Sequence, residues 1–239
     1  MEKILRMNKR KINQEVTDIF FDLDHTLWDF DKNSMLAFAR VFQKHEIDIE
    51  IKDFIKEYEP INFNYWKLFR EDKVTKEELR RGRLIDAFTI FNLNFNLENI
   101  DLLADSYIKE LPADNHLFNG AEMILDYLSE KYILHIITNG FNDVQHLKLK
   151  KSGIKKHFST VTTSEEVGVK KPNPLIFTSA LKKANVNAIN SIMIGDTFEA
   201  DILGAEAVGM KTLFYNYRND TIPSKYIIVD NLHEIKSHL

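Results

Sequence analysis

The sequence contains no cysteine. Disulfide bonds, thiolate catalysis and zinc sites built on cysteine are therefore excluded. It also lacks an excess of positive charge, because 36 acidic residues outnumber 32 basic ones and give a formal net charge of −4. Proteins that bind a DNA or RNA polymer need basic residues to neutralise its phosphates, so we expect no nucleic-acid polymer as a partner.

Long apolar segments are missing as well. No stretch offers the roughly 20 consecutive apolar residues that span a bilayer. The first 16 residues are basic but lack the apolar run of a signal peptide. We therefore predict a cytoplasmic protein without a membrane partner, in which residues 1–15 form a flexible tail.

What the sequence does contain is the composition of an ordinary soluble enzyme. Hydrophobic residues make up 44% and charged residues 28% of the 239 residues. This length suffices for one large α/β domain, or for a core domain with a smaller insert. A small anionic substrate remains compatible with the net charge, because local charge determines what a pocket binds.

Short apolar runs alternate with helical patterns along most of the chain. Five runs are predicted to be buried strands of a parallel sheet, namely Ile19–Phe21, Tyr132–Ile137, Ser191–Ile194, Thr212–Tyr215 and Tyr226–Val229. Between them, apolar residues recur at helical spacing over 121–128, 177–184 and 200–207, and Gly209 is expected to end the last of these helices. This alternation predicts a doubly wound, Rossmann-like α/β core.

The stretch between the first two predicted strands has a different pattern. Apolar residues follow helical spacing at Met35, Phe38, Ala39 and Phe42. A sequence rich in Lys and Glu, with a pattern typical of helices, continues from there. No convincing buried strand interrupts it. We therefore predict an all-helical domain over residues 30–111, inserted into a core formed by residues 16–29 and 112–239.

Two carboxylates follow the first predicted strand directly. Asp22 and Asp24 are two positions apart, and alternation along an extended chain points such residues to the same side. Ligand sites of open α/β sheets lie at the carboxyl ends of the strands, so one carboxylate can act as nucleophile and the other as general acid and base. The alternative is that both residues simply belong to a polar loop that follows the strand and have no function.

Two further clusters follow later in the chain. Thr138-Asn139-Gly140, after the second predicted strand, offers a hydroxyl and backbone N–H groups to a phosphate, although the same residues are typical of an ordinary turn. Lys171-Pro172 places a lysine on a stiff, extended segment, where its ammonium could pair with a phosphoryl group and the nucleophile. The alternative for Lys171 is a solvated side chain.

The fourth cluster follows the predicted strand Ser191–Ile194. Asp196 at the strand end adds a hard oxygen ligand of the kind that Mg²⁺ prefers. Asp201 could orient the metal ligands without binding the ion itself. Alternatively, its negative charge complements the dipole at a helix N-terminus. All four clusters lie at or just after strand ends, and parallel strands would bring these ends together, although Asp22 and Thr138 are 116 residues apart (138 − 22).

These motifs together resemble those of the haloacid-dehalogenase superfamily, from about Thr17 to Tyr215. The matching residues, in chain order, are Asp22, Asp24 and Thr26 of a D-x-D-x-T motif, then Thr138, Lys171, Asp196 and Asp201. The helical insert resembles the mobile cap of this superfamily. The resemblance implies a Mg²⁺-dependent phosphohydrolase that acts on a small phosphorylated metabolite.

The resemblance also implies a role for each matching residue. Asp22 would attack phosphorus and form an aspartyl-phosphate, while Asp24 would protonate the leaving alkoxide and then activate water. The side chains of Asp22 and Asp196 and the backbone carbonyl of Asp24 would hold Mg²⁺. Phosphoryl oxygens would be bound by Thr138, the Asn139 backbone and Lys171, and Asp201 would orient the metal shell.

Three stretches are similar to a narrower group, the bacterial pyrimidine 5′-nucleotidases of this superfamily. They are Phe21–Phe30, Ile136–Phe141 and Met193–Thr197. A sugar-phosphate phosphatase, a phosphoglucomutase-like phosphotransferase and, more remotely, a phosphate-binding module without catalysis stay open. A dehalogenase is disfavoured, because dehalogenases of this superfamily generally lack a carboxylate at the position of Asp24.

Specificity would lie in the helical insert. The residues considered for it are Asn64, Trp66, Arg70, Arg81 and Arg83, because an aromatic ring can stack on a base and an arginine can hydrogen-bond to it. The alternative is that Trp66 packs within the helices and that the arginines are solvated. The sequence does not indicate an oligomeric state.

Overall fold

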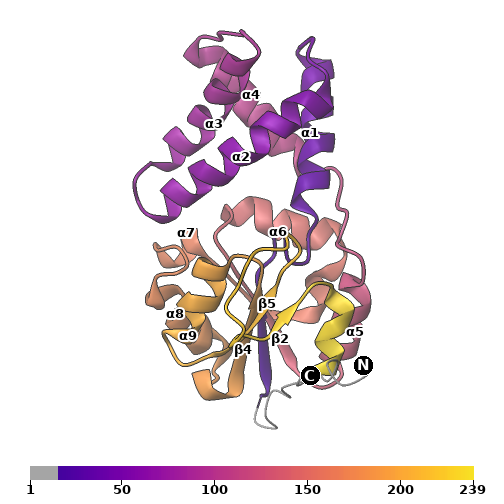
Figure 1. Cartoon of the computed structure of the whole chain (residues 1–239), viewed down its shortest axis with the longest axis vertical. Helices are drawn as coiled ribbons and strands as arrows, with labels where there is room; N and C mark the ends of the chain where they lie inside the picture. Colours follow the sequence, from indigo (N-terminus) through magenta and orange to yellow (C-terminus); the bar gives the residue numbers. More distant parts are fainter. Residues whose placement is uncertain (1–15) are drawn as a thin grey trace, which may run out of the picture. The chain divides into compact units, whose positions relative to one another are not determined.

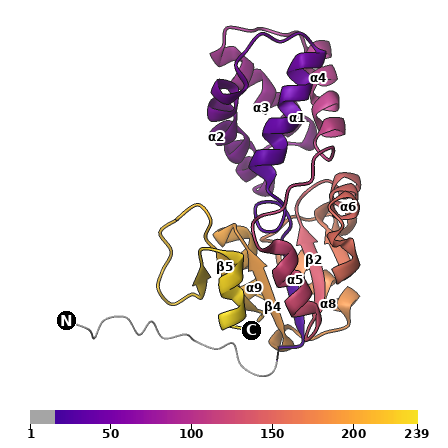
Figure 2. The same ribbon diagram turned by 90° about the vertical axis from the view of Figure 1, so that its right-hand side faces the viewer.

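The computed structural model describes residues 16–239, which form two compact units (Figures 1 and 2). One unit combines residues 16–28 with Leu117–Leu239, and the other is Asp29–His116. We call them the α/β unit and the helical unit. The tail predicted over residues 1–15 lies outside the described residues.

The α/β unit is built on a six-stranded sheet in which every neighbouring pair of strands is parallel. The strand order is β3-β2-β1-β4-β5-β6. This is the order of a doubly wound Rossmann sheet, so the predicted fold class is confirmed. The strands are β1 (Asp18–Phe21), β2 (Ile133–Thr138), β3 (Phe158–Thr163), β4 (Ser191–Gly195), β5 (Lys211–Tyr215) and β6 (Ile228–Val229).

Helices cover the two faces of this sheet. In Figure 1 the strands lie between α8 and α9 on the left and α5 on the right. The helical elements are α5 (Ala121–Ser129), α6 (Asn142–Lys151), η1 (Ile154–His157), α7 (Ser164–Val167), α8 (Pro174–Ala184), η2 (Ala188–Asn190), η3 (Phe198–Leu203), α9 (Gly204–Glu206) and η4 (Leu232–Ser237). The central strands β1 and β4 are buried along their whole length, as expected for a sheet covered on both faces.

Local sequence signals explain several helix ends. Pro174 lies at the start of α8, where its missing N–H costs no helical hydrogen bond, and the Asn173 side chain accepts from Leu175 N at 3.0 Å. Gly209, which was expected to end a helix, has a φ of +86°. This left-handed conformation is one that glycine adopts without strain.

Strand β3 was not predicted from the sequence. It reads Phe-Ser-Thr-Val-Thr-Thr and forms an edge of the sheet beside β2. Its side chains alternate in burial only weakly and include few apolar residues, so the search for apolar runs missed it. Its content of Thr and Val was the available signal, because β-branched residues favour strands.

The helical unit consists of four helices, and residues 29–116, all of which are described, contain no strand. The helices are α1 (Phe30–Lys44), α2 (Ile51–Arg70), α3 (Lys76–Ile90) and α4 (Leu97–Glu110). Buried aromatic rings fill the space between them. Phe38 on α1 stacks on Tyr107 on α4 with ring centroids 4.2 Å apart, and it meets Phe54 on α2 edge-on at 4.9 Å. Each such ring contributes about 1.5–3 kcal/mol by leaving water.

The two ends of the helical unit are held together by one buried side chain. The Asn33 Nδ2 donates to Asp29 O at 2.7 Å and to His116 O at 2.9 Å, while Asn33 Oδ1 accepts from His116 N at 2.9 Å. Asp29 N also donates to His116 O at 3.0 Å. From the sequence, the insert was predicted to end at residue 111, one residue after the end of α4. In the structure, the helical unit extends to His116, which these contacts join to the start of the unit.

No helix between residues 16 and 239 combines the length and the apolar character needed to cross a membrane.

Candidate active site

The site lies where the strand order of the sheet reverses. Strands β1 and β4 are neighbours there, although paired residues such as Asp18 and Ser191 are 173 positions apart in the sequence (191 − 18). Asp22 follows β1, and its N–H continues the ladder by donating to Ile194 O on β4 at 2.9 Å. Asp196 follows β4 directly. Open α/β sheets bind ligands at such a switch point, outside the carboxyl ends of the strands.

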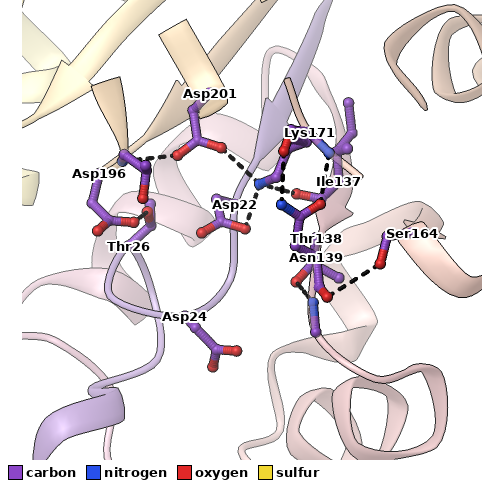
Figure 3. A network of polar contacts seen from close by, with 12 residues as sticks. Asp22, Asp24, Thr26, Ile137, Thr138, Asn139, Ser164, Lys171, Asp196 and Asp201 are labelled. Atoms are coloured by element: carbon purple, nitrogen blue, oxygen red, sulfur yellow. Dashed lines mark hydrogen bonds and ion pairs between the residues drawn. The ribbon is translucent and has the colours of Figure 1, made fainter. Parts of the chain in front are cut away.

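Three buried carboxylates meet at this point (Figure 3). One oxygen each of Asp22, Asp196 and Asp201 lies within 4.8 Å of the other two. Asp201 comes from η3, and its Oδ2 accepts from Thr197 N at 2.9 Å. A glycine is required beside it, because a Cβ on Gly195 would lie 2.3 Å from Asp201 Oδ2. The carboxylates offer hard oxygen ligands at the spacing that a divalent cation can bridge.

Lys171 lies among these carboxylates, with only 2% of its surface exposed. Its Nζ donates to Asp22 Oδ1 at 2.7 Å and to Ile137 O at 2.8 Å, and it lies 2.7 Å from Asp201 Oδ1. The alternative of a solvated lysine is therefore wrong. The ion pair with Asp201 also gives that residue a contact beyond the backbone of its own helical turn.

The Asn139 side chain fixes the segment that carries this lysine. Its Nδ2 donates to Lys171 O at 3.0 Å, and its Oδ1 accepts from Lys171 N at 2.8 Å. The backbone carbonyl of Asn139 accepts from Ser164 Oγ at 3.1 Å. The amide thus joins the end of β2 to the Lys171 segment, a contact that the sequence did not predict.

Thr138 and Asp24 share one partner on helix α6, Gln145. Thr138 Oγ1 accepts from Gly140 N at 3.2 Å and from Gln145 Nε2 at 2.7 Å. Asp24 Oδ2 accepts from Gln145 Nε2 at 3.0 Å, and Asp24 Oδ1 lies 2.6 Å from Lys148 Nζ. Sequence reasoning missed Gln145 and Lys148. Their place on the helix after the Thr-Asn-Gly turn was visible, but polar residues on a helix surface are usually solvated.

Thr26, the last residue of the first motif, supports the opposite side of the site. Its hydroxyl is completely buried and donates to Asp196 Oδ1 at 3.3 Å. Arg218, on the loop after β5, lies with Nη1 3.8 Å from the other oxygen of this carboxylate. The seven residues that match the motifs thus surround the carboxyl ends of β1, β2 and β4.

The electrostatics of the cluster favour a bound cation. Burial, assisted by the charge of Asp201 and opposed by Lys171, raises the pKa of Asp22 from its ordinary value of 3.8 to about 7. Burial and the charges of Asp22 and Asp201 raise the pKa of Asp196 well above its ordinary value. For Lys171, the effect of burial is outweighed by Asp201 and Asp22, so its pKa is raised. A divalent cation would relieve the repulsion between the carboxylates.

We expect Asp22→Asn to be more stable than the wild-type protein at about pH 8 in EDTA, but not at about pH 4. Because the pKa of Asp22 is raised in the folded state, the stabilisation that its neutral form gives is lost as the pH rises through about 7. Asparagine does not ionise. Thermal unfolding of both proteins across this pH range measures the effect, and a difference that is independent of pH would contradict it.

Comparison with known proteins identifies the family of this chain. The family model described as haloacid dehalogenase-like hydrolase matches residues 19–215, which include every residue of the cluster. The chain belongs to the haloacid dehalogenase-like hydrolase family.

Individual relatives of this hydrolase have different names. It is 32% identical over 225 residues to the pyrimidine 5′-nucleotidase YjjG of Escherichia coli, covering 92% of this chain and 96% of that one. It is 35% identical over 213 residues to a glyceraldehyde 3-phosphate phosphatase of Pyrococcus abyssi, covering 83% and 81%. A crystal structure of the HAD-hydrolase YfnB of Bacillus subtilis, bound to magnesium and revealing interdomain movement, matches with a TM-score of 0.84 and 27% identity over 93% and 97% of the chains.

The five residues considered for specificity in this hydrolase differ in their surroundings. Asn64 is exposed, Arg70 is half-buried, and Trp66 contacts the ring of Phe69 edge-on at 5.7 Å. Arg81 forms ion pairs with Asp101 and Glu77.

Arg83 is not solvated as the alternative assumed. Only 2% of its surface is exposed. Its Nη1 donates to Asn62 Oδ1 at 2.8 Å, and its guanidinium carbon lies 5.4 Å from the ring centroid of Tyr107. These contacts place Arg83 in the polar part of the helical unit's interior.

Proposed function

We propose that this haloacid dehalogenase-like hydrolase is a Mg²⁺-dependent phosphomonoesterase that acts on nucleoside 5′-monophosphates, pyrimidine ones in particular. The observation that carries the proposal is the Lys171 ammonium in contact with Asp22 and Asp201, beside Asp196, at the switch point of the sheet. The nucleotide is favoured as substrate because the match to YjjG covers 92% of this chain, against 83% for the glyceraldehyde 3-phosphate phosphatase.

In the first step, a carboxylate oxygen of Asp22 attacks phosphorus. A phosphorus–oxygen bond forms to Asp22, and the bond to the substrate alkoxide breaks. Asp24 gives its proton to the leaving oxygen, so the nucleoside departs as a neutral alcohol and the phosphoryl group remains as an aspartyl-phosphate. Lys171 and Thr138 bind phosphoryl oxygens and offset their negative charge, together with the backbone of Asn139.

In the second step, the Asp24 carboxylate takes a proton from water. The water oxygen attacks phosphorus, the bond to Asp22 breaks, and inorganic phosphate is released with Asp22 regenerated. Asp24 is thereby protonated again for the next turnover. Lys171, whose Nζ donates to Asp22 Oδ1 at 2.7 Å before the reaction, retains its proton throughout.

The carboxylate cluster fits a magnesium ion. Its donors are hard oxygens, it is buried, and its own charges oppose one another. The side chains of Asp22 and Asp196 and the backbone carbonyl of Asp24 would hold the ion, and Asp201 would orient its shell. When bound, Mg²⁺ supplies positive charge that lowers the repulsion between the anionic nucleophile and the phosphate.

We also propose that the helical unit acts as a cap that moves during turnover. The interdomain movement in the YfnB structure supports this proposal. Closure of such a unit would exclude bulk water from the aspartyl-phosphate. Crystals with and without a phosphate mimic that show the same angle between the units would contradict it.

Phosphate release from a panel of nucleoside monophosphates and sugar phosphates tests the proposed function. We expect release that requires Mg²⁺ and stops in EDTA, with the highest kcat/KM for UMP or dTMP. A preference for glyceraldehyde 3-phosphate would favour the second candidate, a sugar-phosphate phosphatase, which the match to the Pyrococcus enzyme supports. Transfer of phosphate only to an added alcohol would indicate a phosphotransferase, and no release at all would contradict hydrolysis.

A further inference from the structure

Both carboxylate oxygens of Asp24 are held by side chains from helix α6. Asp24 Oδ1 accepts from Lys148 Nζ at 2.6 Å, and Asp24 Oδ2 accepts from Gln145 Nε2 at 3.0 Å. Gln145 and Lys148 are three positions apart, so they lie on the same face of α6. The orientation of the Asp24 carboxylate is therefore determined by two residues outside the motifs that the sequence analysis identified.

Lys148 is buried, which is unfavourable for a charged ammonium group unless neighbouring groups compensate for the loss of water. Its surface is 1% exposed, whereas the side chain of Asp24 is 22% exposed. The Lys148 Nζ also lies 4.1 Å from the ring centroid of Trp28, a completely buried residue. Burial of an ammonium is unfavourable unless a carboxylate or an aromatic face compensates it. A lysine in this position is thus specified by its contacts with Asp24 and Trp28.

Gln145 connects Asp24 to the residue proposed to bind phosphate. The same Nε2 that donates to Asp24 also donates to Thr138 Oγ1 at 2.7 Å, and Gln145 is 1% exposed. The backbone makes room for this contact, because a Cβ on Gly140 would lie 2.4 Å from Gln145 Cδ. One amide therefore sets the position of Asp24 relative to Thr138.

We propose that Lys148 and Gln145 are positioning residues for proton transfer to the leaving group. The proposal rests on the proposed function, in which Asp24 gives its proton to the leaving oxygen. Each carboxylate oxygen has two lone pairs, so the contacts with Lys148 and Gln145 leave a direction free for the substrate.

The leaving group of the substrate distinguishes this role from a merely structural one. The alkoxide of a nucleoside 5′-monophosphate is a poor leaving group that requires a proton, whereas p-nitrophenolate leaves readily without one. The ratio kcat/KM reports the steps up to departure of the leaving group and is insensitive to later hydrolysis of the aspartyl-phosphate. A positioning residue for the proton donor therefore affects the two substrates unequally.

We expect Lys148→Met to lower kcat/KM for UMP by about 10²-fold or more, and that for p-nitrophenyl phosphate by less than about tenfold. Methionine keeps the length and the apolar stem of the side chain, so packing against Trp28 is retained. Gln145→Met should show the same selectivity, and Lys148→Arg should recover part of the activity on UMP. Lys150→Met, an exposed lysine on the same helix, is the matched control and should leave both substrates unaffected.

Each outcome bears on the proposal. Equal losses for both substrates would assign Lys148 a structural role and overturn it, as would no loss for either. Asp24→Asn is measured in parallel as the reference for loss of the proton donor. If the wild-type protein hydrolyses neither ester, the proposed function itself is wrong, whereas a selective loss in Asp24→Asn without one in Lys148→Met contradicts only the positioning role.

Discussion

Replacing Asp22 with asparagine is expected to lower the rate of phosphate release by at least about 10³-fold, because an amide cannot form the acyl phosphate. Asparagine has nearly the same shape as aspartate, and its carbonyl oxygen can still accept from Lys171 Nζ, which lies 2.7 Å from Asp22 Oδ1. The loss therefore reports the chemistry rather than the fold. Steady-state release of phosphate from UMP in the presence of Mg²⁺ measures it.

The matched control for this variant lies at the other end of the same strand. Asp18 belongs to β1, and its Oδ1 lies 2.8 Å from His135 Nε2. It is not part of the carboxylate cluster. Asp18→Asn should lower stability while the remaining folded enzyme keeps its turnover. Residual activity of Asp22→Asn above about a tenth of the wild-type rate, with unchanged metal dependence, would exclude Asp22 as the nucleophile.

The second large effect is expected at Lys171. Lys171→Met should lower kcat/KM by about 10²- to 10³-fold, the loss typical of removing one group that stabilises transition-state charge. It should also destabilise the metal-free protein by about 3–5 kcal/mol, because a buried ion pair loses one partner. The contact with Asp22, the contact with Asp201 and the hydrogen bond to Ile137 O all disappear together.

Kinetics and chemical denaturation in EDTA and in Mg²⁺ separate these two effects. Added Mg²⁺ should restore part of the stability of Lys171→Met, because a cation replaces some of the lost positive charge, but it should not restore the rate. The neighbouring Lys170 is only half-buried, so Lys170→Met is the control for loss of a lysine in this segment. Activity of Lys171→Met within about tenfold of the wild type would contradict the proposed role.

The sequence allowed the fold class to be predicted because its central strands are short and strongly apolar. Strands β1 and β4 are fully buried, and a carboxylate follows each at the edge where ligands bind. The four motifs could be placed together because parallel strands have their carboxyl ends at one edge. In the structure, the Lys171 ammonium contacts both Asp22 and Asp201.

Other features depend on tertiary contacts that no local pattern reveals. Gln145 and Lys148 are polar residues on α6, and their burial is explained by contacts with Asp24, more than 120 residues earlier, and with Thr138 and Trp28. Arg83 is buried for a comparable reason, since its partner Asn62 lies on another helix. Strand β3 was missed because an edge strand rich in threonine lacks the apolar run of a central strand.

The hydrogen bonds by which Asn33 joins the two ends of the helical unit have a consequence for the evolution of this chain. Because Asp29 N reaches His116 O at 3.0 Å, the helical unit begins and ends at nearly the same point in space. Trp28 and Leu117, the flanking residues of the α/β unit, pair with each other as well. Insertions are best tolerated where their two ends lie close together. An 88-residue segment (116 − 29 + 1) can therefore be gained, lost or exchanged between genes at this junction without altering the register of the sheet.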